Sequence, residues 1–251
     1  MQRQPWSLAA SGAGYEIAYG RRGRREAARQ WRFVRALSEF EGLPPGSLIL
    51  DLGAGRGRLA AALAAEGLHP LAIDRSAPAL ATARRRGTRW GVRAELARLP
   101  LRTGRVQAAV ALFSSLGHDG ADQLARELSE VARALAPGAP VAVDLADPES
   151  VQRGLEPCGE RRVGGLWIRE RRRLTRDSTG RPRAVHKRVR LGRGGYEVAR
   201  WHEHLPLWTP DEVLAAALAA TLDAPRVLRG PALDGFGPGR LLLLARAPVG
   251  D

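Results

Sequence analysis

Short apolar runs alternate with amphipathic stretches along this chain, a pattern typical of strands that alternate with helices. The apolar runs at 48–50, 70–73 and 140–145 predict buried strands. Apolar residues recur at spacings of four, three and four in one helical stretch: Leu124, Leu128, Val131 and Leu135. Thr209 and Pro210 form a good N-cap and first-turn pair for a second helix over 211–222. The pattern predicts an α/β fold with a mostly parallel sheet.

The stretch 48–60, LILDLGAGRGRLA, ends an apolar run in an acid and then places three glycines at alternate positions. Gly53, Gly55 and Gly57 can adopt backbone angles closed to other residues and let a ligand approach the main chain. A helix beginning near Arg58 would point its first N–H groups at the same place. This strand, turn and helix start indicate a site for a nucleotide-like cofactor.

Asp51 favours one cofactor class over another, although the glycines alone also satisfy a dinucleotide-binding pattern. A carboxylate two residues before the first glycine would repel a pyrophosphate. S-adenosylmethionine instead carries an ammonium and a sulfonium, which a carboxylate attracts. An NAD-dependent oxidoreductase remains an alternative, further disfavoured by the lack of a second catalytic domain.

The run from Ile49 through Asp51 to Gly53, Ala54 and Gly55 resembles the first motif of class I S-adenosylmethionine-dependent methyltransferases. A second apolar run ends at Asp74, 19 residues beyond Gly55, where an acid can accept hydrogen bonds from both ribose hydroxyls. A turn or cap residue is the alternative interpretation of Asp74, with Ser76 as a competing cap.

The resemblance extends to 94–118, which looks like the family's third and fourth strands. It implies that Glu95 lies near the adenine amino group, with the longer glutamate in place of the more usual aspartate, and that the Leu96 backbone completes the adenine contact. Gln107 replaces another frequent aspartate and is expected to be structural. The resemblance further implies cofactor contacts for three residues: Ala54, Arg75 and Phe113.

His118 and two tyrosines are the remaining candidates. His118 resembles the substrate-pocket position of sugar N-methyltransferases, where it would be the catalytic residue that orients the acceptor or accepts a proton. A loop histidine capping Asp119 is the alternative. Tyr15 and Tyr19 lie one helical turn apart and resemble a segment that covers the cofactor in this group, although they could equally pack a helix onto the core.

Residues 153–193 contain 14 Arg or Lys and 4 Asp or Glu, an excess of 10 basic groups. Their pattern predicts an inserted antiparallel sheet with strands at 166–175, 184–191 and 196–205. These basic residues have two possible interpretations: a face that only meets solvent, or a face that binds an anionic substrate. RNA is the weaker candidate ligand, because the interleaved aromatic residues of a single-strand platform are missing.

The resemblance of 240–247 to a last, antiparallel strand completes the expected fold. We expect a Rossmann-like, seven-stranded, mostly parallel sheet plus the small inserted antiparallel sheet. The expected parts are 1–152 with the N-terminal helix and cofactor-binding part, 153–205 with the insertion, and 206–251 with a helix and strand that complete the domain.

Composition narrows the class of protein. The 251 residues can bury a full core, no apolar run approaches the roughly 20 residues that span a bilayer, and no apolar signal core is present. The single Cys158 excludes an intramolecular disulfide and favours the cytoplasm. The net charge of +14 comes almost wholly from arginine, which suggests a GC-rich genome. His202 and His204 could share one strand face, but no third ligand is evident beside them, so no metal is expected.

The sequence therefore predicts a monomeric or homodimeric enzyme that moves a methyl group from S-adenosylmethionine to a nitrogen or oxygen atom of a small molecule, leaving S-adenosylhomocysteine. The basic insertion would suit an anionic acceptor. An RNA methyltransferase that binds nucleic acid through the insertion is the second interpretation.

Overall fold

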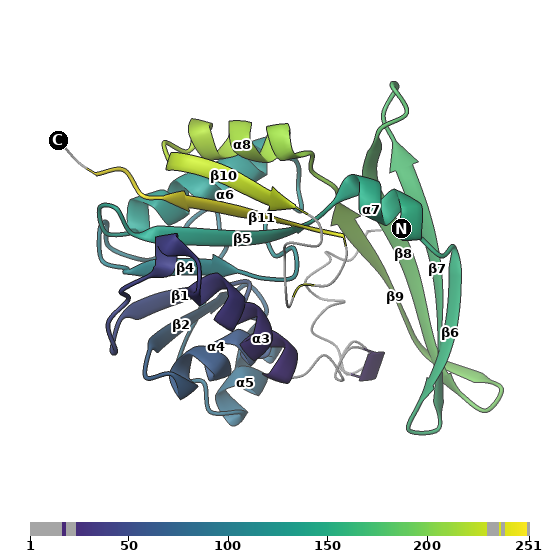
Figure 1. The fold of residues 1–251 in the computed structure, drawn as a ribbon. Helices are drawn as coiled ribbons and strands as arrows, with labels where there is room; N and C mark the ends of the chain where they lie inside the picture. The colour runs from purple at the N-terminus through teal and green to yellow at the C-terminus, as the bar shows by residue number, and fades with distance from the viewer. Residues whose placement is uncertain (1–16, 19–23, 230–235, 237–238, 250–251) are drawn as a thin grey trace.

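The computed structural model describes residues 17–18, 24–229, 236 and 239–249. Its main sheet has seven strands in the order β10-β11-β5-β4-β1-β2-β3 (Figure 1). The strands are β1 (Leu48–Leu52), β2 (His69–Asp74), β3 (Trp90–Arg93), β4 (Ala108–Ala111), β5 (Pro140–Ala146), β10 (Asp223–Arg229) and β11 (Arg240–Arg246). Strands β1 to β5 pair in parallel, and β11 runs antiparallel to both β5 and β10. The predicted Rossmann-like sheet with an antiparallel last strand is confirmed.

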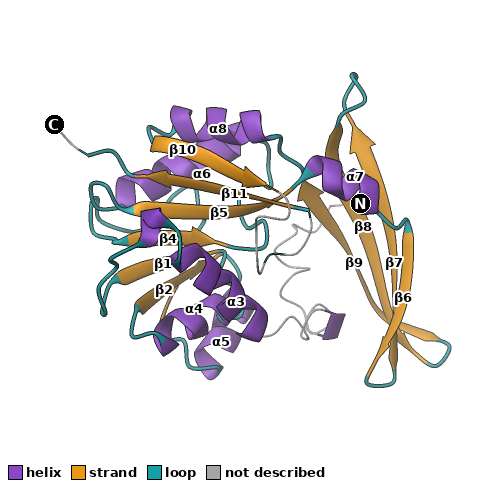
Figure 2. Cartoon of the chain, in the orientation of Figure 1, coloured by secondary structure: helices purple, strands orange, loops and turns teal. Residues whose placement is uncertain are grey.

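Helices cover both faces of this sheet (Figure 2). They are α3 (Arg24–Arg35), α4 (Arg58–Ala65), α5 (Ala77–Arg85), α6 (Ala121–Ala134) and α8 (Pro210–Ala219), with a 3-10 turn η1 (Ser38–Phe40). Helix α7 (Pro148–Gly154) instead lies against the second sheet described below (Figure 1). Successive β1 residues enter different core clusters: Leu50 packs with residues of α6 and α8, and Ile49 with residues of α3 and α4. Burial on both faces explains why these strands are apolar throughout.

Local signals fix the helix starts. The Thr209 hydroxyl accepts from the Glu212 N–H at 3.2 Å, and the Glu212 carboxylate accepts from the Thr209 N–H at 2.9 Å, which is a complete capping box for α8. Ser76 caps α5 by accepting from the Ala79 N–H at 3.2 Å. Within the described residues, no helix combines the length and apolar character needed to cross a bilayer.

A second, antiparallel sheet stands beside the first, in the order β6-β7-β8-β9 (Figure 1). Its strands are β6 (Cys158–Val163), β7 (Leu166–Arg176), β8 (Pro182–Arg193) and β9 (Tyr196–Pro206). The three inserted strands expected from the sequence are confirmed, while β6 and α7 were not predicted. The domain boundaries at 152 and 205 stay an interpretation.

Two expectations about the main sheet need correction. The third strand is β3 (Trp90–Arg93), which ends before the stretch 94–118 that was expected to contain it. Strand β10 (Asp223–Arg229), between α8 and the last strand, was not located in the sequence at all. Both strands lie at the edges of the sheet, where fewer side chains are buried.

Candidate functional site

The carboxyl ends of β1, β2 and β4 meet at one edge of the main sheet, because these strands are parallel neighbours. In open α/β sheets ligands bind outside this edge. The glycine turn follows β1, Asp74 ends β2, and the 112–118 loop follows β4. The fold therefore brings together the three segments that the sequence singled out.

The three positions of the turn require glycine for different reasons. All have positive φ, at 67° for Gly53, 54° for Gly55 and 70° for Gly57. A Cβ on Gly53 would lie 2.4 Å from Ser115 Cβ, and one on Gly57 would lie 2.3 Å from Thr88 Oγ1. A Cβ on Gly55 would meet nothing closer than the Gly53 carbonyl oxygen at 4.0 Å. Gly53 and Gly57 thus permit packing, whereas Gly55 faces open space that a ligand can enter.

Asp74 ties the second strand to the glycine turn. Its Oδ2 accepts from the Gly55 N–H at 2.7 Å, and its Oδ1 accepts from the Ser76 N–H at 2.7 Å. Burial raises the pKa of Asp74, while these two hydrogen bonds act in the opposite direction. A carboxylate has about four acceptor positions, so each oxygen keeps one for a ribose hydroxyl. Asp74 can therefore hold the turn and bind the ribose hydroxyls at the same time.

Asp51 has a structural contact that the sequence analysis did not foresee. It is buried, and its Oδ2 accepts from the N–H of Ala60 in the first turn of α4 at 3.0 Å. Gly57 is the N-cap of that helix and offers no capping side chain, so Asp51 supplies the acceptor. Burial raises the pKa of Asp51 to about 7. Its carboxyl group can therefore gain or lose a proton near neutral pH.

The segment after β3 places Glu95 and Leu96 at the same sheet edge. The Glu95 side chain is largely exposed, and its carboxylate lies 3.8 Å from an Arg75 guanidinium nitrogen. Leu96 is buried in the core, which fixes the local main chain. Arg75 directly follows Asp74 and also lies close enough to lower the pKa of that carboxyl group. The predicted adenine side of the site is thus assembled from neighbouring residues.

The loop after β4 holds an unusual backbone conformation. Phe113 and Ser114 have φ values of 63° and 56°, a region that costs a non-glycine residue about 1–3 kcal/mol. Buried Asp144 on β5 holds both: its Oδ2 accepts from the Phe113 N–H at 2.7 Å, and its carbonyl accepts from the Ser114 N–H at 3.0 Å. Arg240 on β11 donates to Asp144 Oδ1 at 2.6 Å and to Ser114 Oγ at 3.0 Å.

This conformation connects the loop to the glycine turn. The Phe113 ring lies under the Arg58 guanidinium, with 4.3 Å between the guanidinium carbon and the ring centroid. Ser115 occupies the space that Gly53 leaves open. The sequence analysis included Phe113 but missed Asp144 and Arg240. An acid inside the apolar strand Pro140–Ala146 was the available signal, since a buried charge requires a partner.

His118 lies further along the same loop and is partly buried. Burial, together with the nearby charges of Arg75 and of His204 on β9, lowers the pKa of His118 to about 4. Its imidazole is therefore neutral at pH 7. Because the Gly117 N–H donates to buried Glu127 of α6 at 2.8 Å, the backbone before His118 is fixed. Gly117 also packs against the indole of Trp208, so the His118 loop lies beside the end of β9.

Several sequence candidates lie outside this assembly. Tyr15 and Tyr19 fall outside the described residues, so their expected cofactor contacts remain predictions. Gln107 accepts from the Leu48 N–H at 2.8 Å, which fits the structural role expected of it. His202 and His204 share one face of β9 while Glu203 is on the other, and no metal-binding group of three His, Cys, Asp or Glu occurs among the residues described.

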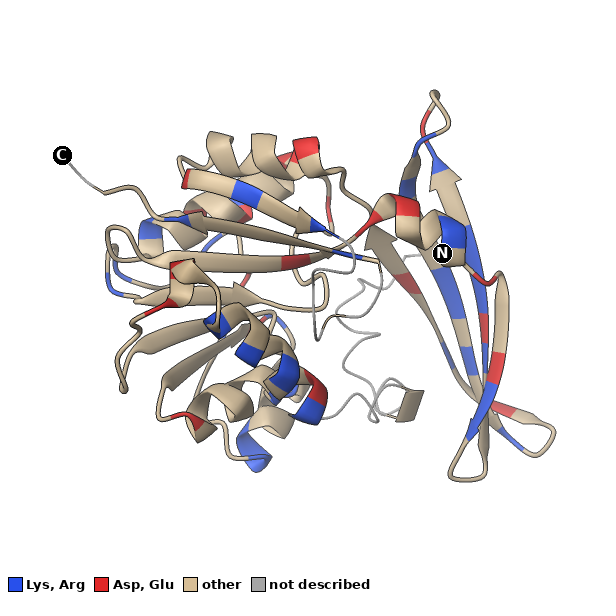
Figure 3. Cartoon of the chain, in the orientation of Figure 1, with Lys and Arg blue, Asp and Glu red and all other residues tan. Residues whose placement is uncertain are grey.

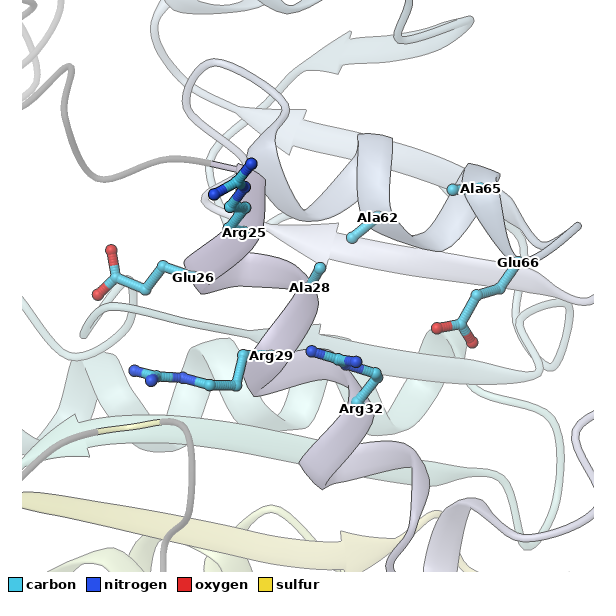
Figure 4. A pocket seen from close by; sticks show the side chains of 8 residues that line it. All are labelled: Arg25, Glu26, Ala28, Arg29, Arg32, Ala62, Ala65 and Glu66. Atoms are coloured by element: carbon cyan, nitrogen blue, oxygen red, sulfur yellow. The ribbon is translucent and has the colours of Figure 1, made fainter.

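A groove of about 730 Å³ lies between α3 and α4, apart from the glycine turn (Figure 4). Its lining residues are Arg25, Glu26, Ala28, Arg29, Arg32, Ala62, Ala65 and Glu66. None of them is a residue that the sequence predicted for the site. The α4 residues that line it come from the second half of that helix, away from the Arg58 end that meets the turn.

Comparison with protein families identifies residues 49–138 as matching a family described as a methyltransferase domain. This range contains β1 to β4, the glycine turn, Asp74 and His118. A comparison with curated proteins gave no match.

Solved structures share the fold over nearly the whole chain. A S-adenosylmethionine-dependent methyltransferase from Clostridium acetobutylicum is 14% identical, with a TM-score of 0.72 over 93% of this chain and 95% of its own. CalS10, an amino pentose methyltransferase from Micromonospora echinaspora solved with bound cofactor, is 22% identical, with a TM-score of 0.68 over 98% and 100%. The sugar N-methyltransferase KedS8 from Streptoalloteichus is 20% identical, with a TM-score of 0.67 over 99% and 94%.

Proposed function

We propose that the chain is a class I S-adenosylmethionine-dependent methyltransferase and that it methylates a nitrogen or oxygen atom of a small-molecule acceptor. The competing oxidoreductase interpretation does not fit the domain match. The observation that carries the proposal is the joining of Asp74 to the Gly55 N–H beside the open space at Gly55.

The residues present suit the cofactor. Asp74 would hold the ribose through its remaining acceptor positions, and Gly55 would let the cofactor approach the main chain. Asp51 would supply negative charge for the cationic end, since its pKa of about 7 leaves a carboxylate available at neutral pH. Glu95 and the Leu96 backbone would meet the adenine. These roles follow from the family resemblance and the positions of the side chains.

S-adenosylmethionine supplies a methyl group that is already activated on a sulfonium ion, so the protein has chiefly to align an acceptor and exclude water. His118 is better suited to orient the methyl acceptor than to act as a general base. With a pKa of about 4, its neutral imidazole can accept a hydrogen bond from an acceptor N–H or O–H and so direct a lone pair. A neutral amine requires no stronger base, which favours nitrogen over oxygen as the methylated atom.

A small-molecule acceptor is supported by the site and by the neighbours. Gly117, next to His118, packs against Trp208, two residues after β9 ends, so the second sheet joins the main domain beside the loop where an acceptor would lie. Neighbours of the same fold include enzymes described as acting on an amino pentose, a sugar and a glycopeptide. We therefore propose an amine-bearing small molecule as the first acceptor class to test.

Calorimetry with S-adenosylmethionine, S-adenosylhomocysteine and NAD tests the cofactor. We expect the first two to bind with micromolar or lower Kd and NAD to bind far more weakly. Transfer of a labelled methyl group to a panel of matched amino and hydroxy sugars then tests the acceptor. Binding of the cofactor without transfer to any amine or hydroxyl in the panel would contradict the proposed acceptor class while leaving the cofactor assignment intact.

A further inference from the structure

One face of the second sheet carries an ordered array of basic groups. The register places nine side chains of β7, β8 and β9 in three rows: Arg169, Arg190 and Arg200; Arg171, Arg188 and His202; and Arg173, His186 and His204. We call these nine residues the cationic face. Figure 3 shows basic positions recurring along β7 and β8. Successive rows lie two residues apart along a strand, so the array is about 13 Å long and about 10 Å wide.

Acidic side chains compensate only the first row. Glu197 binds Arg190 and, at 2.9 Å, Arg200, while Glu160 accepts from Arg169 at 2.8 Å. In the other two rows, the exposed side chains of Arg171, Arg173 and Arg188 have no carboxylate partner within the part of the chain that the structure describes. The positive charge of these three arginines is therefore not compensated by a carboxylate of the described residues.

This arrangement opposes the stability of the sheet. Arg171 lies directly across from Arg188, and Arg169 from Arg190, and like charges in such positions are destabilising. The opposite face differs, because buried Glu170 there binds Arg161, Arg172 and Lys187. An arginine-rich composition accounts for the residue type on both faces. It does not account for the contrast between the cations that share a buried carboxylate on one face and Arg171, Arg173 and Arg188 on the other, which have no carboxylate partner among the described residues.

The shape and charge of the cationic face restrict its ligand. A second copy of the chain is disfavoured, because a two-fold contact through this face would bring arginine against arginine. A lone small molecule is disfavoured as well, since such ligands occupy concave sites and these arginines are exposed on an open sheet. An extended polyanion satisfies both conditions.

We propose that the cationic face binds the phosphate backbone of a nucleic-acid duplex. A duplex presents one charge per about 1.7 Å of its axis, so a face about 13 Å long meets several phosphates at once. Its bases are stacked inside, so the face requires no exposed aromatic ring. Trp167, on the same side of β7, is buried, and the Arg169 guanidinium covers its ring at 4.7 Å. The lack of aromatic residues that counts against single-strand binding is therefore expected for a duplex.

The third row ends at His204 of β9, four residues before Trp208, which packs against Gly117 in the His118 loop. The inference does not depend on the methyl acceptor. Binding is measured without S-adenosylmethionine, so the failure of either proposal leaves the other standing.

The test is fluorescence anisotropy of a labelled DNA duplex of about 20 base pairs, titrated with the full chain at several salt concentrations. We expect binding that weakens steeply with salt. The variant Arg171→Gln/Arg173→Gln/Arg188→Gln should bind about tenfold more weakly at low salt. Its plot of log affinity against log salt should be shallower by about 2 to 3, close to 0.9 for each lost phosphate contact.

A matched control is Arg84→Gln/Arg85→Gln/Arg102→Gln, which removes the same charge from exposed positions on the main domain. This variant should keep duplex affinity within about threefold of the parent, because long-range attraction is screened by salt. Equal losses in the two variants would overturn the proposal, as would the absence of duplex binding at low salt. Equally strong competition by a poly-glutamate peptide or a single strand of the same charge would also overturn it. Unchanged thermal unfolding shows that each variant is folded.

Discussion

Arg240 and Asp144 form an ion pair across neighbouring strands, with 2.6 Å between Arg240 Nε and Asp144 Oδ1. The Asp144 side chain is fully buried, and Arg240 is 19% exposed. The pair also holds the 112–118 loop, because Asp144 binds the Phe113 N–H and Arg240 binds Ser114 Oγ. It thus connects the last strand to the loop that carries His118.

Replacing Arg240 by Met should destabilise the protein by about 3 kcal/mol, because it leaves a buried carboxylate without its cation. The loop should loosen as well, so the KM for the cofactor should rise. Urea unfolding and initial rates measure the two effects. Arg240→Lys, which restores the charge, should recover part of the stability. A stability loss in Arg240→Met no larger than in the exposed control Arg84→Ala would contradict the importance of the pair.

Asp74→Ala should weaken S-adenosylmethionine binding by about 1.5–3 kcal/mol, because charge-assisted hydrogen bonds to the ribose are lost. Asp74→Asn should lose less, since its amide oxygen can still accept from one N–H. Calorimetry provides the Kd values, and Glu41→Gln, an exposed acid located before β1, serves as a control that should keep the parent affinity. Unchanged affinity in a folded Asp74→Ala protein would show that Asp74 only closes the turn.

We expect substitutions at two positions of the glycine turn to have different effects, one on cofactor binding and the other on thermal stability. Gly55→Val should abolish cofactor binding, because its side chain enters open space that we assign to the cofactor. The core should stay folded, although the positive φ of 54° at this position costs a valine about 1–3 kcal/mol. Gly53→Ala should lower the melting temperature, because its Cβ would lie 2.4 Å from Ser115 Cβ. Adding Ser115→Gly should restore part of that loss. Full cofactor binding by Gly55→Val would place the cofactor elsewhere.

Asp51 predicts a pH dependence of cofactor affinity. Its pKa of about 7 means that the cation-attracting carboxylate form is lost as pH falls below 7. The affinity for S-adenosylmethionine should therefore fall from pH 8 to pH 6, and binding near pH 6 should release a proton. S-adenosylhomocysteine has no sulfonium charge and should show a weaker trend. Calorimetry in buffers of different ionisation enthalpy measures the proton, and the release should vanish in Asp51→Asn.

The raised pKa of Asp51 also implies that the free energy of unfolding depends on pH. The folded protein keeps the Asp51 proton up to a pKa of about 7, whereas an unfolded chain releases it near the ordinary value of 3.8. Between these values the unfolded state binds fewer protons, so the contribution of Asp51 to the free energy of unfolding falls as pH rises and is constant above 7. Asp51→Asn, whose amide oxygen can still accept from Ala60, should remove this fall. Denaturant unfolding at pH 5 and 8 provides the comparison.

His118→Asn should lower kcat or raise the acceptor KM by about 10²-fold, in line with the loss of a positioned proton partner, while cofactor affinity stays unchanged. With a pKa of about 4, His118 does not titrate between pH 5 and 8, so its removal should leave the shape of the pH–rate profile the same in that range. A rate transition near 6.5 that disappears in His118→Asn would show that the imidazole instead acts as a titrating base.

The strands that sequence patterns placed poorly are edge strands. β3 and β10 are the two outer strands of the main sheet, and β6 is an outer strand of the second. β6 carries Glu160, Arg161 and Arg162 in a six-residue strand, and β10 carries Pro225 and two arginines. Edge strands bury fewer side chains, so their apolar pattern is weak. The central strands were located because burial on both faces requires continuous apolar runs.

In the site, too, features formed by residues close in sequence could be predicted, whereas contacts between residues far apart in sequence could not. The glycine turn and Asp74 lie within one strand, turn, helix and strand unit, so their spacing could be interpreted along the chain. The Asp144–Arg240 pair joins residues 96 positions apart on antiparallel strands, and only the sheet register brings them together. The helix contact of Asp51 is also a product of packing, although its position at a strand end was evident.

The second sheet leaves and rejoins the main domain at nearly one place. Ala146 at the end of β5 and Leu207 just after β9 belong to one small apolar cluster with Val185. The segment from α7 to β9 is therefore inserted between two points of the main domain that lie close together. Because the chain leaves and returns at the same place, a change in the length of this segment need not displace the seven-stranded sheet or its glycine turn.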